Sequence, residues 1–132
     1  MKILIVNDDG IQAEGIYKLA EVLSAEHSVT VVAPHTQKSG YSHSLSFHKT
    51  VSYAPYNIGL PIKAYSLTGT PCDCVKFAID VLMKDQEPDM ILCGINDDYI
   101  DKESICFPDI YEYNSINNIF LVCFTKGFVC SF

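Results

Sequence analysis

The chain has 132 residues, of which 48% are hydrophobic and 19% are charged. This length fits one domain, and this balance is typical of a globular protein rather than a disordered or fibrous one. Sixteen acidic residues against nine basic ones give a net charge of −7 without a basic run, which argues against binding of a nucleic-acid duplex.

The start of the chain has no pattern of a secretory signal, because Met1 and Lys2 lead into a short apolar run that ends at Asn7. The sequence also has no apolar stretch of the roughly 18 residues that a membrane span needs. We therefore expect a cytoplasmic protein with no membrane partner. In that compartment the six cysteines are expected to be reduced thiols rather than a disulfide framework.

The first third of the chain predicts a strand, a helix and a second strand. Residues 2–6 form a β-branched apolar run, which is typical of a strand buried on both faces of a parallel sheet. Apolar residues at helical spacing predict an amphipathic helix over residues 13–25, and a buried strand follows at residues 29–33. Such a βαβ unit has a right-handed crossover, so the chain is expected to be an α/β protein.

The later elements are less regular. Residues 34–50 lack a period and predict a loop, and extended segments at 51–56 and 62–67 predict a hairpin. Thr70 and Pro71 predict the start of a helix that runs to about residue 85, and residues 90–93 predict another buried strand. Beyond residue 96 we expect only a candidate strand at 119–124. The apolar tail over 119–132 is either core or an exposed end that promotes association, and we favour the second.

Polar side chains follow the predicted buried strands at the points where these strands end. Asp8 and Asp9 come directly after the first strand, and two adjacent carboxylates are costly unless a cation neutralises them. An isolated Asp-Asp-Gly is more often a solvated turn. Ser39 and Asn96, however, follow two other strands, and the carboxyl ends of parallel strands share one edge. The four oxygen donors suit Mg²⁺, Mn²⁺ or Ca²⁺, and a water on such an ion can attack phosphorus.

Four segments resemble a known family in their order and spacing. They are MKILIVNDDGIQAEGIYKLAEVL, VVAPHTQKSGYSHSLSF, LTGTPCDCVKFAID and PDMILCGIN. They resemble the SurE family of stationary-phase survival proteins, which are 5′/3′-nucleotidases. The resemblance implies a Rossmann-like, mostly parallel sheet in a three-layer α/β/α arrangement, hydrolysis of nucleoside monophosphates, and a homodimer or tetramer. It also implies one divalent ion held by Asp8, Asp9, Ser39 and Asn96, with Asp8 and Asp9 as the catalytic residues.

Further candidates for contact with substrate lie around these segments. They are Asn7, Lys38, Gly40 and Thr70. A simpler interpretation exists for several of them, because a loop lysine is usually solvated and Thr70 with Asp73 can act as a helix cap. The loop histidines, His35, His43 and His48, could contact phosphate or act as an acid, but solvated side chains are the default interpretation.

The resemblance ends at Asn96. We predict a SurE-like metal-binding core over residues 1–96 and a divergent tail over 97–132. Relative to that family, we expect the tail to lack the glycine-rich loop and the Ser-Gly-Thr turn, and the chain to lack the family's C-terminal region with much of its oligomerisation surface. A frameshifted or prematurely ended reading frame is one hypothesis for this change, and resequencing of the gene tests it. We expect impaired turnover, because backbone amides at a helix N-terminus are what position a phosphate.

Two other functions compete with that of an impaired phosphomonoesterase. The first is a non-catalytic remnant that binds metal or nucleotide without turnover. The second is a phosphorelay receiver domain, which also has an acidic pair after its first strand. A receiver needs another Asp at the end of a later strand, and neither Ala33-Pro34 nor Gly94-Ile95-Asn96 supplies it.

Overall fold

The structure is a computed structural model that describes residues 1–38, 46, 50–96, 120–125 and 128–131. These residues contain one sheet of seven strands in the order β3-β4-β2-β1-β5-β6-β7. The strands are β1 (Lys2–Val6), β2 (Ser28–Pro34), β3 (Tyr53–Pro55), β4 (Lys63–Leu67), β5 (Met90–Asn96), β6 (Phe120–Thr125) and β7 (Phe128–Ser131). Strands β4, β2, β1, β5 and β6 run parallel, and β3 and β7 pair antiparallel at the two edges.

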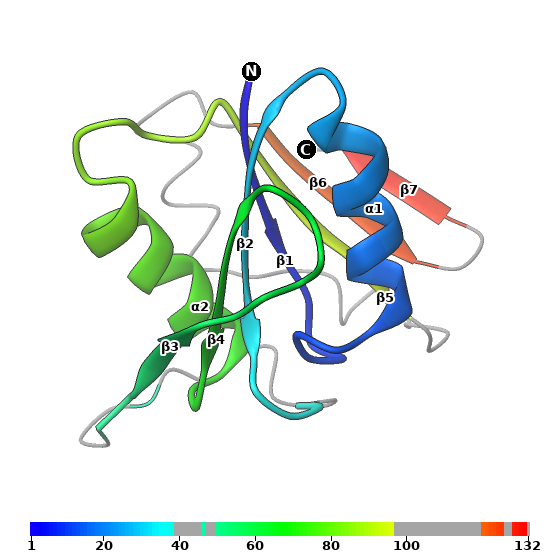
Figure 1. The fold of residues 1–132 in the computed structure, drawn as a ribbon. Coiled ribbons are helices and arrows are strands. Elements are labelled where there is room, and N and C mark those ends of the chain that lie inside the picture. Colours follow the sequence, from blue (N-terminus) through cyan, green and yellow to red (C-terminus); the bar gives the residue numbers. More distant parts are fainter. Residues whose placement is uncertain (39–45, 47–49, 97–119, 126–127, 132) are drawn as a thin grey trace.

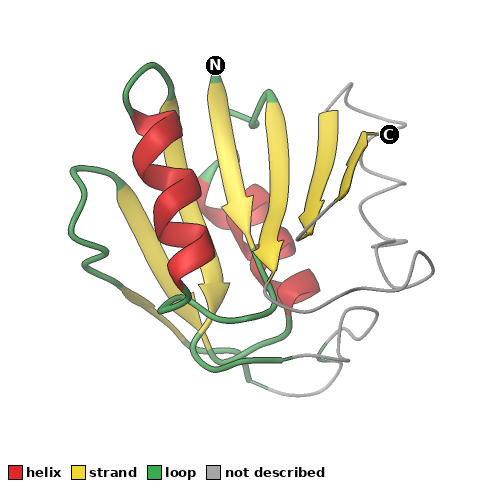
Figure 2. Cartoon of the chain, turned by 90° about the vertical axis from the view of Figure 1, so that its right-hand side faces the viewer, coloured by secondary structure: helices red, strands yellow, loops and turns green. Residues whose placement is uncertain are grey.

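Helices cover both faces of the sheet, which gives three layers (Figures 1 and 2). Helix α1 (Glu14–Ser24) packs on one face, over a core cluster that includes Ile3, Ile5 and Val31. Helix α2 (Pro71–Phe77) continues into the π-helical segment η1 (Ala78–Leu82) and packs on the other face. The parallel central strands, buried on both faces, confirm the predicted Rossmann-like α/β fold.

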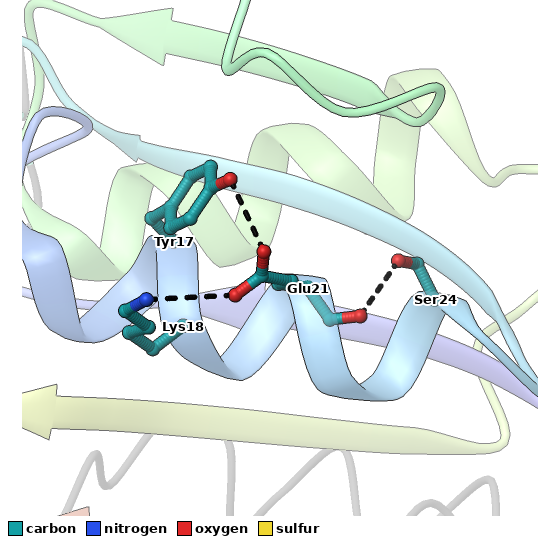
Figure 3. A network of polar contacts seen from close by, with 4 residues as sticks. All are labelled: Tyr17, Lys18, Glu21 and Ser24. Atoms are coloured by element: carbon teal, nitrogen blue, oxygen red, sulfur yellow. Dashed lines mark hydrogen bonds and ion pairs between the residues drawn. The ribbon is translucent and has the colours of Figure 1, made fainter.

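Helix α1 is held on the sheet by its apolar face. Ile16 and Ala20 lie one turn apart, and both are fully buried. On the outward surface, Glu21 accepts a hydrogen bond from the Tyr17 hydroxyl at 3.3 Å and forms a 3.6 Å ion pair with Lys18 (Figure 3). Such exposed pairs contribute little to stability, so the burial of the apolar face is what fixes the helix. The predicted span of 13–25 is confirmed to within a residue at each end.

The second helix begins where the sequence predicts and then departs from a regular α-helix. Thr70 and Asp73 form a capping box, and Pro71 occupies the first turn. From Ala78 the hydrogen bonding widens, and the backbone N–H of Met83 donates to the carbonyl of Ala78 at 2.8 Å. This five-residue spacing is that of a π-helix. The predicted helix to about residue 85 is therefore helical as far as Leu82, with π-helical rather than α-helical hydrogen bonding in its second half.

The remaining strands agree with the predictions in type, but several differ from them in length. Strands β3 and β4 pair antiparallel as the predicted hairpin, although β3 is short. Strand β5 extends beyond the predicted 90–93 to Asn96, and it contains Gly94, whose φ of +119° favours glycine. In the tail, β6 pairs parallel with β5, and β7 was not predicted. The division at residue 96 and the exposed apolar end both stay predictions.

Candidate metal centre

The acidic turn after β1 is built by Asn7 and Gly10. The side chain of Asn7 is 1% exposed, and its Nδ2 donates to the carbonyl of Gly10 at 3.1 Å while its Oδ1 accepts from the N–H of Gly10 at 3.2 Å. Gly10 has a φ of +101°, which residues other than glycine rarely adopt. The amide of Asn7 therefore closes the turn that presents Asp8 and Asp9, and its predicted contact with substrate stays a prediction.

The loop after β2 lies directly on this turn. The N–H of Lys38 donates to the carbonyl of Asp8 at 2.7 Å, and the N–H of Ile11 donates to the carbonyl of Pro34 at 2.9 Å. The side chains of Asp8 and Asp9 are both half-buried, and Oδ1 of Asp8 is shielded from solvent. The loop that continues to Ser39 is thus attached to the main chain of the predicted metal ligand Asp8.

The sheet order brings the third predicted segment to the same edge. Strand β1 lies between β2 and β5, with Ile5 paired to Val31 and Val6 paired to Cys93. All three strands run parallel, so the acidic turn, the start of the loop after β2 and Asn96 at the end of β5 lie at one edge. The side chain of Asn96, together with Ser39 and Gly40, falls outside the described residues. Their assignment as ligands and contacts stays a prediction.

Helix α1 approaches this edge closely at Gly15. A Cβ added to Gly15 would overlap the carbonyl oxygen of Ile95, the residue before Asn96. Only a glycine allows the first turn of the helix and the end of β5 to meet at this distance. Gly15 therefore helps to set the position of the β5 end relative to the acidic turn.

Thr70 is committed to the cap of α2. Its side chain accepts a hydrogen bond from the N–H of Asp73 at 3.2 Å, and its own N–H donates to Asp73 Oδ2 at 2.7 Å. Thr70 is also 7% exposed. The capping interpretation of Thr70 is confirmed, and a contact between Thr70 and substrate stays a prediction.

Asp73 has a second role that the sequence did not predict. Its carboxylate accepts hydrogen bonds from the Ser46 N–H at 3.1 Å and from the Ser46 hydroxyl at 2.8 Å. Burial acts to raise the pKa of Asp73, but the hydrogen bonds from Thr70 and Ser46 outweigh it and hold that pKa below 3.8. Asp73 thus fixes one point of the segment between β2 and β3, the segment that contains Ser39. The only signal in the sequence was a carboxylate in the first turn of a helix.

The other candidates take structural positions where they are described. His35 is exposed, and its Nδ1 lies 3.3 Å from the hydroxyl of Ser66, while His43 and His48 fall outside the described residues. Cys72, Cys74 and Cys93 are buried and take part in no disulfide within the described residues, which confirms the prediction of reduced thiols for these three. Burial, with a smaller contribution from the charges of Asp73 and Cys72, raises the pKa of Cys74 strongly.

The donor set at the edge fits a hard divalent cation better than a soft one. Among the described residues, no group of three or more His, Cys, Asp and Glu side chains is arranged to hold a metal ion. The described donors are the two half-buried carboxylates of Asp8 and Asp9. Carboxylate oxygens are preferred by Mg²⁺, Mn²⁺ and Ca²⁺, and a site with two of them needs neutral oxygens to complete it. The hydroxyl of Ser39 and the amide of Asn96 are of this kind.

The fold and this edge define a class, a three-layer α/β protein with a mostly parallel sheet and an acidic turn at its carboxyl edge. The family model of the survival protein SurE matches residues 3–99, and the chain belongs to this family. The resemblance seen in the sequence is therefore confirmed. None of the helices in the described part of the chain has both the length and the apolar character of a membrane span.

Several relatives carry the name 5′-nucleotidase SurE. The protein from Clostridium botulinum strain Langeland is 50% identical over 100 residues, and this match covers 73% of this chain and 38% of the relative. The protein from Alkaliphilus metalliredigens is 47% identical over 97 residues, and this match also covers 73% of this chain and 38% of the relative. The crystal structure of the SurE protein from Aquifex aeolicus matches with a TM-score of 0.68 at 35% identity, over 80% of this chain and 41% of that one. The chain thus spans about 38% of the length of these curated relatives.

Proposed function

We propose that this chain binds one divalent ion, Mg²⁺ or Mn²⁺, at the carboxyl edge of its sheet and hydrolyses nucleoside monophosphates as a 5′/3′-nucleotidase. The observation that carries the proposal is the position of β1 between the parallel strands β2 and β5, with the loop after β2 bonded to the main chain of Asp8. This arrangement gathers three strand ends around two adjacent carboxylates. Relatives named 5′-nucleotidase SurE supply the reaction class.

Each residue of the proposed site has a separate task. The carboxylates of Asp8 and Asp9 hold the ion, and the ion relieves the repulsion between them. The hydroxyl of Ser39 and the amide of Asn96 complete the oxygen ligands and leave positions for water and phosphate. When bound, the ion supplies Lewis-acid stabilisation of phosphate oxygens and a water of lowered pKa. Lys38 adds a positive charge beside the phosphate, and Asn7 keeps the acidic turn in shape.

We propose that turnover by this chain is impaired. The family match ends at residue 99, and residues 97–132 contain neither a glycine-rich loop nor a Ser-Gly-Thr turn. Without that loop and turn to bring backbone amides to the phosphate, the metal can bind while the substrate is poorly oriented. Orientation accounts for a large part of the rate of such reactions. The same observation favours a second candidate function, a metal- and nucleotide-binding protein without turnover.

Metal binding is tested first, by calorimetric titration of Mn²⁺ and by thermal unfolding with and without Mn²⁺. The native protein should bind the ion and its unfolding midpoint should rise, since the ion binds the folded state. Asp8→Asn and Asp9→Asn should each weaken binding at least about tenfold, which corresponds to ~1.4 kcal/mol. The matched control is Asp85→Asn, an exposed carboxylate between η1 and β5. Equal affinity in all four proteins contradicts the metal centre.

Turnover is then measured as phosphate release from nucleoside monophosphates with Mg²⁺ or Mn²⁺. The native chain should release phosphate slowly and in a metal-dependent manner, and Asp8→Ala and Asn96→Ala should abolish release. Equal rates in the three proteins would remove the catalytic proposal. Metal binding without any release would select the non-catalytic alternative.

A further inference from the structure

A cavity of about 360 Å³ lies at the amino edge of the sheet. Its lining includes the first residues of three neighbouring strands, Lys63 of β4, Ser28 of β2 and Lys2 of β1. The acidic turn follows the other end of β1, and the five residues of this strand span roughly 16 Å. Figure 1 shows the start of β1 and the turn after it at opposite ends of the sheet. The cavity is therefore separate from the candidate metal centre.

The cavity exists because the apolar packing under η1 stops before the edge of the sheet. Side chains of a strand alternate between its two faces, so Lys2 shares a face with Leu4, and Thr30 shares a face with Val32. Leu4 and Val32 are fully buried in the core cluster under α2 and η1. Lys2 and Thr30 lie on the same face two residues closer to the amino edge, and they line the cavity instead of packing in the core cluster. The π-helical segment ends at Leu82, which forms part of the opposite lining.

The charge of the lining is positive in a protein whose net charge is −7. Lys2, Lys63 and His27 line the cavity, and its lining contains no Asp or Glu. Within the described part of the chain, neither of these two lysines forms an ion pair. Asp89 accepts a hydrogen bond from the backbone N–H of Lys2 at 2.6 Å but does not belong to the lining. Two lysines in one lining, Lys2 half-buried and Lys63 exposed, favour a dianionic ligand.

The rest of the lining sets the size and polarity of the ligand. Tyr65, Leu82 and Met83 provide an apolar wall, and the hydroxyls of Ser28 and Thr30 can donate hydrogen bonds. The volume is near the lower limit for cavities that bind small molecules, about 300–1,000 Å³. A ligand that fills it is about the size of a mononucleotide or smaller.

We propose that this amino-edge cavity is a second binding site, which takes a small phosphate monoester. The phosphate dianion contacts Lys2 and Lys63, and the organic part packs on Leu82 and Met83. The site does not need the metal centre at the opposite edge, so it binds its ligand when divalent ions are removed.

The first ligand tested is phenylphosphonate, a dianion at about pH 8 that a phosphatase does not hydrolyse. Inorganic phosphate is the second ligand tested. Binding to the full chain is measured by calorimetry in the presence of EDTA. Lys2→Met and Lys63→Met keep the apolar part of each side chain and remove its charge, and each should weaken phenylphosphonate binding about tenfold, or ~1.4 kcal/mol. Inorganic phosphate should bind more weakly than phenylphosphonate, because it does not reach the apolar wall.

Two control variants test whether phenylphosphonate binding depends on the cavity rather than on the overall charge of the protein or on the metal centre. Lys76→Met removes an exposed lysine of α2 that lies outside the lining, and Asp8→Asn alters the opposite edge. Both should bind phenylphosphonate within about twofold of the native protein, since neither residue lines the cavity. The proposal is overturned if the native protein does not bind phenylphosphonate, if Lys63→Met binds as well as Lys76→Met, or if Asp8→Asn abolishes binding.

Discussion

Substitution of Asp73 tests how the segment between β2 and β3 is attached to the rest of the protein. Asp73→Ala removes the acceptor of four hydrogen bonds, two from Thr70 and two from Ser46. Alanine at position 73 still donates its backbone N–H to the Thr70 cap, so only the carboxylate half of the capping box is lost, at a cost of about 1 kcal/mol. Each bond from Ser46 to this charged but half-buried carboxylate contributes ~1.5 kcal/mol at most, the lower end of the range for charged groups. We expect the free energy of unfolding to fall by about 2–4 kcal/mol.

The pH dependence of this effect has a definite sign. The pKa of Asp73 in the folded protein lies below its ordinary value of 3.8, because the bonds from Thr70 and Ser46 outweigh burial. The stabilisation is therefore complete above pH 3.8 and is lost as the pH falls through the lowered pKa. Asp73→Asn, which cannot ionise, should differ from the native protein by a constant amount from about pH 7 to pH 5. Below pH 3.8 this difference should shrink.

Urea unfolding, followed by circular dichroism at several pH values, measures both quantities. The matched control is Asp85→Ala, an exposed carboxylate, which should change the unfolding free energy by less than about 0.5 kcal/mol. The reasoning fails if Asp73→Ala resembles this control, or if the difference between Asp73→Asn and the native protein is the same at pH 3 as at pH 7. An Asp73→Ala chain that still binds Mn²⁺ as tightly would show that the Ser46 contact does not organise the metal centre.

Three further predictions concern the core and the helix contacts. Gly15→Ala should lower the free energy of unfolding in urea by about 1–3 kcal/mol, because the new methyl group meets the backbone oxygen of Ile95. A change below about 0.5 kcal/mol would contradict this close approach. Ile5→Ala, at a fully buried position of β1, should cost about 2–5 kcal/mol in the same assay, and a smaller loss would mean that the core is looser than described. Cys74 should react slowly with a thiol reagent at about pH 8 until the protein is unfolded, because burial raises its pKa, and rapid labelling of the native protein would refute this.

The sequence by itself determined the elements whose signals are local. The β-branched run of β1, the helical spacing of α1 and the Thr70-Pro71 start of α2 each lie within a few residues, and the structure has all three where the sequence predicts them. The acidic turn is equally local, since Asn7 and Gly10 close it within four residues. The prediction that the strand ends share one edge followed from parallel pairing, and the pairing of β1, β2 and β5 is parallel.

Only the tertiary structure decided how distant segments meet. Asp73 holds Ser46 across 27 positions of the sequence, and the cavity at the amino edge combines the starts of three strands with the end of η1. The change to π-helical hydrogen bonding after Phe77 likewise had no local signal. Periodicity records which face of an element is buried, whereas contacts between elements depend on sheet order, strand length and where each helix stops packing. Sheet order, strand length and the ends of helix packing are set by the assembled core. The spacing of residue types along the chain therefore does not predict them.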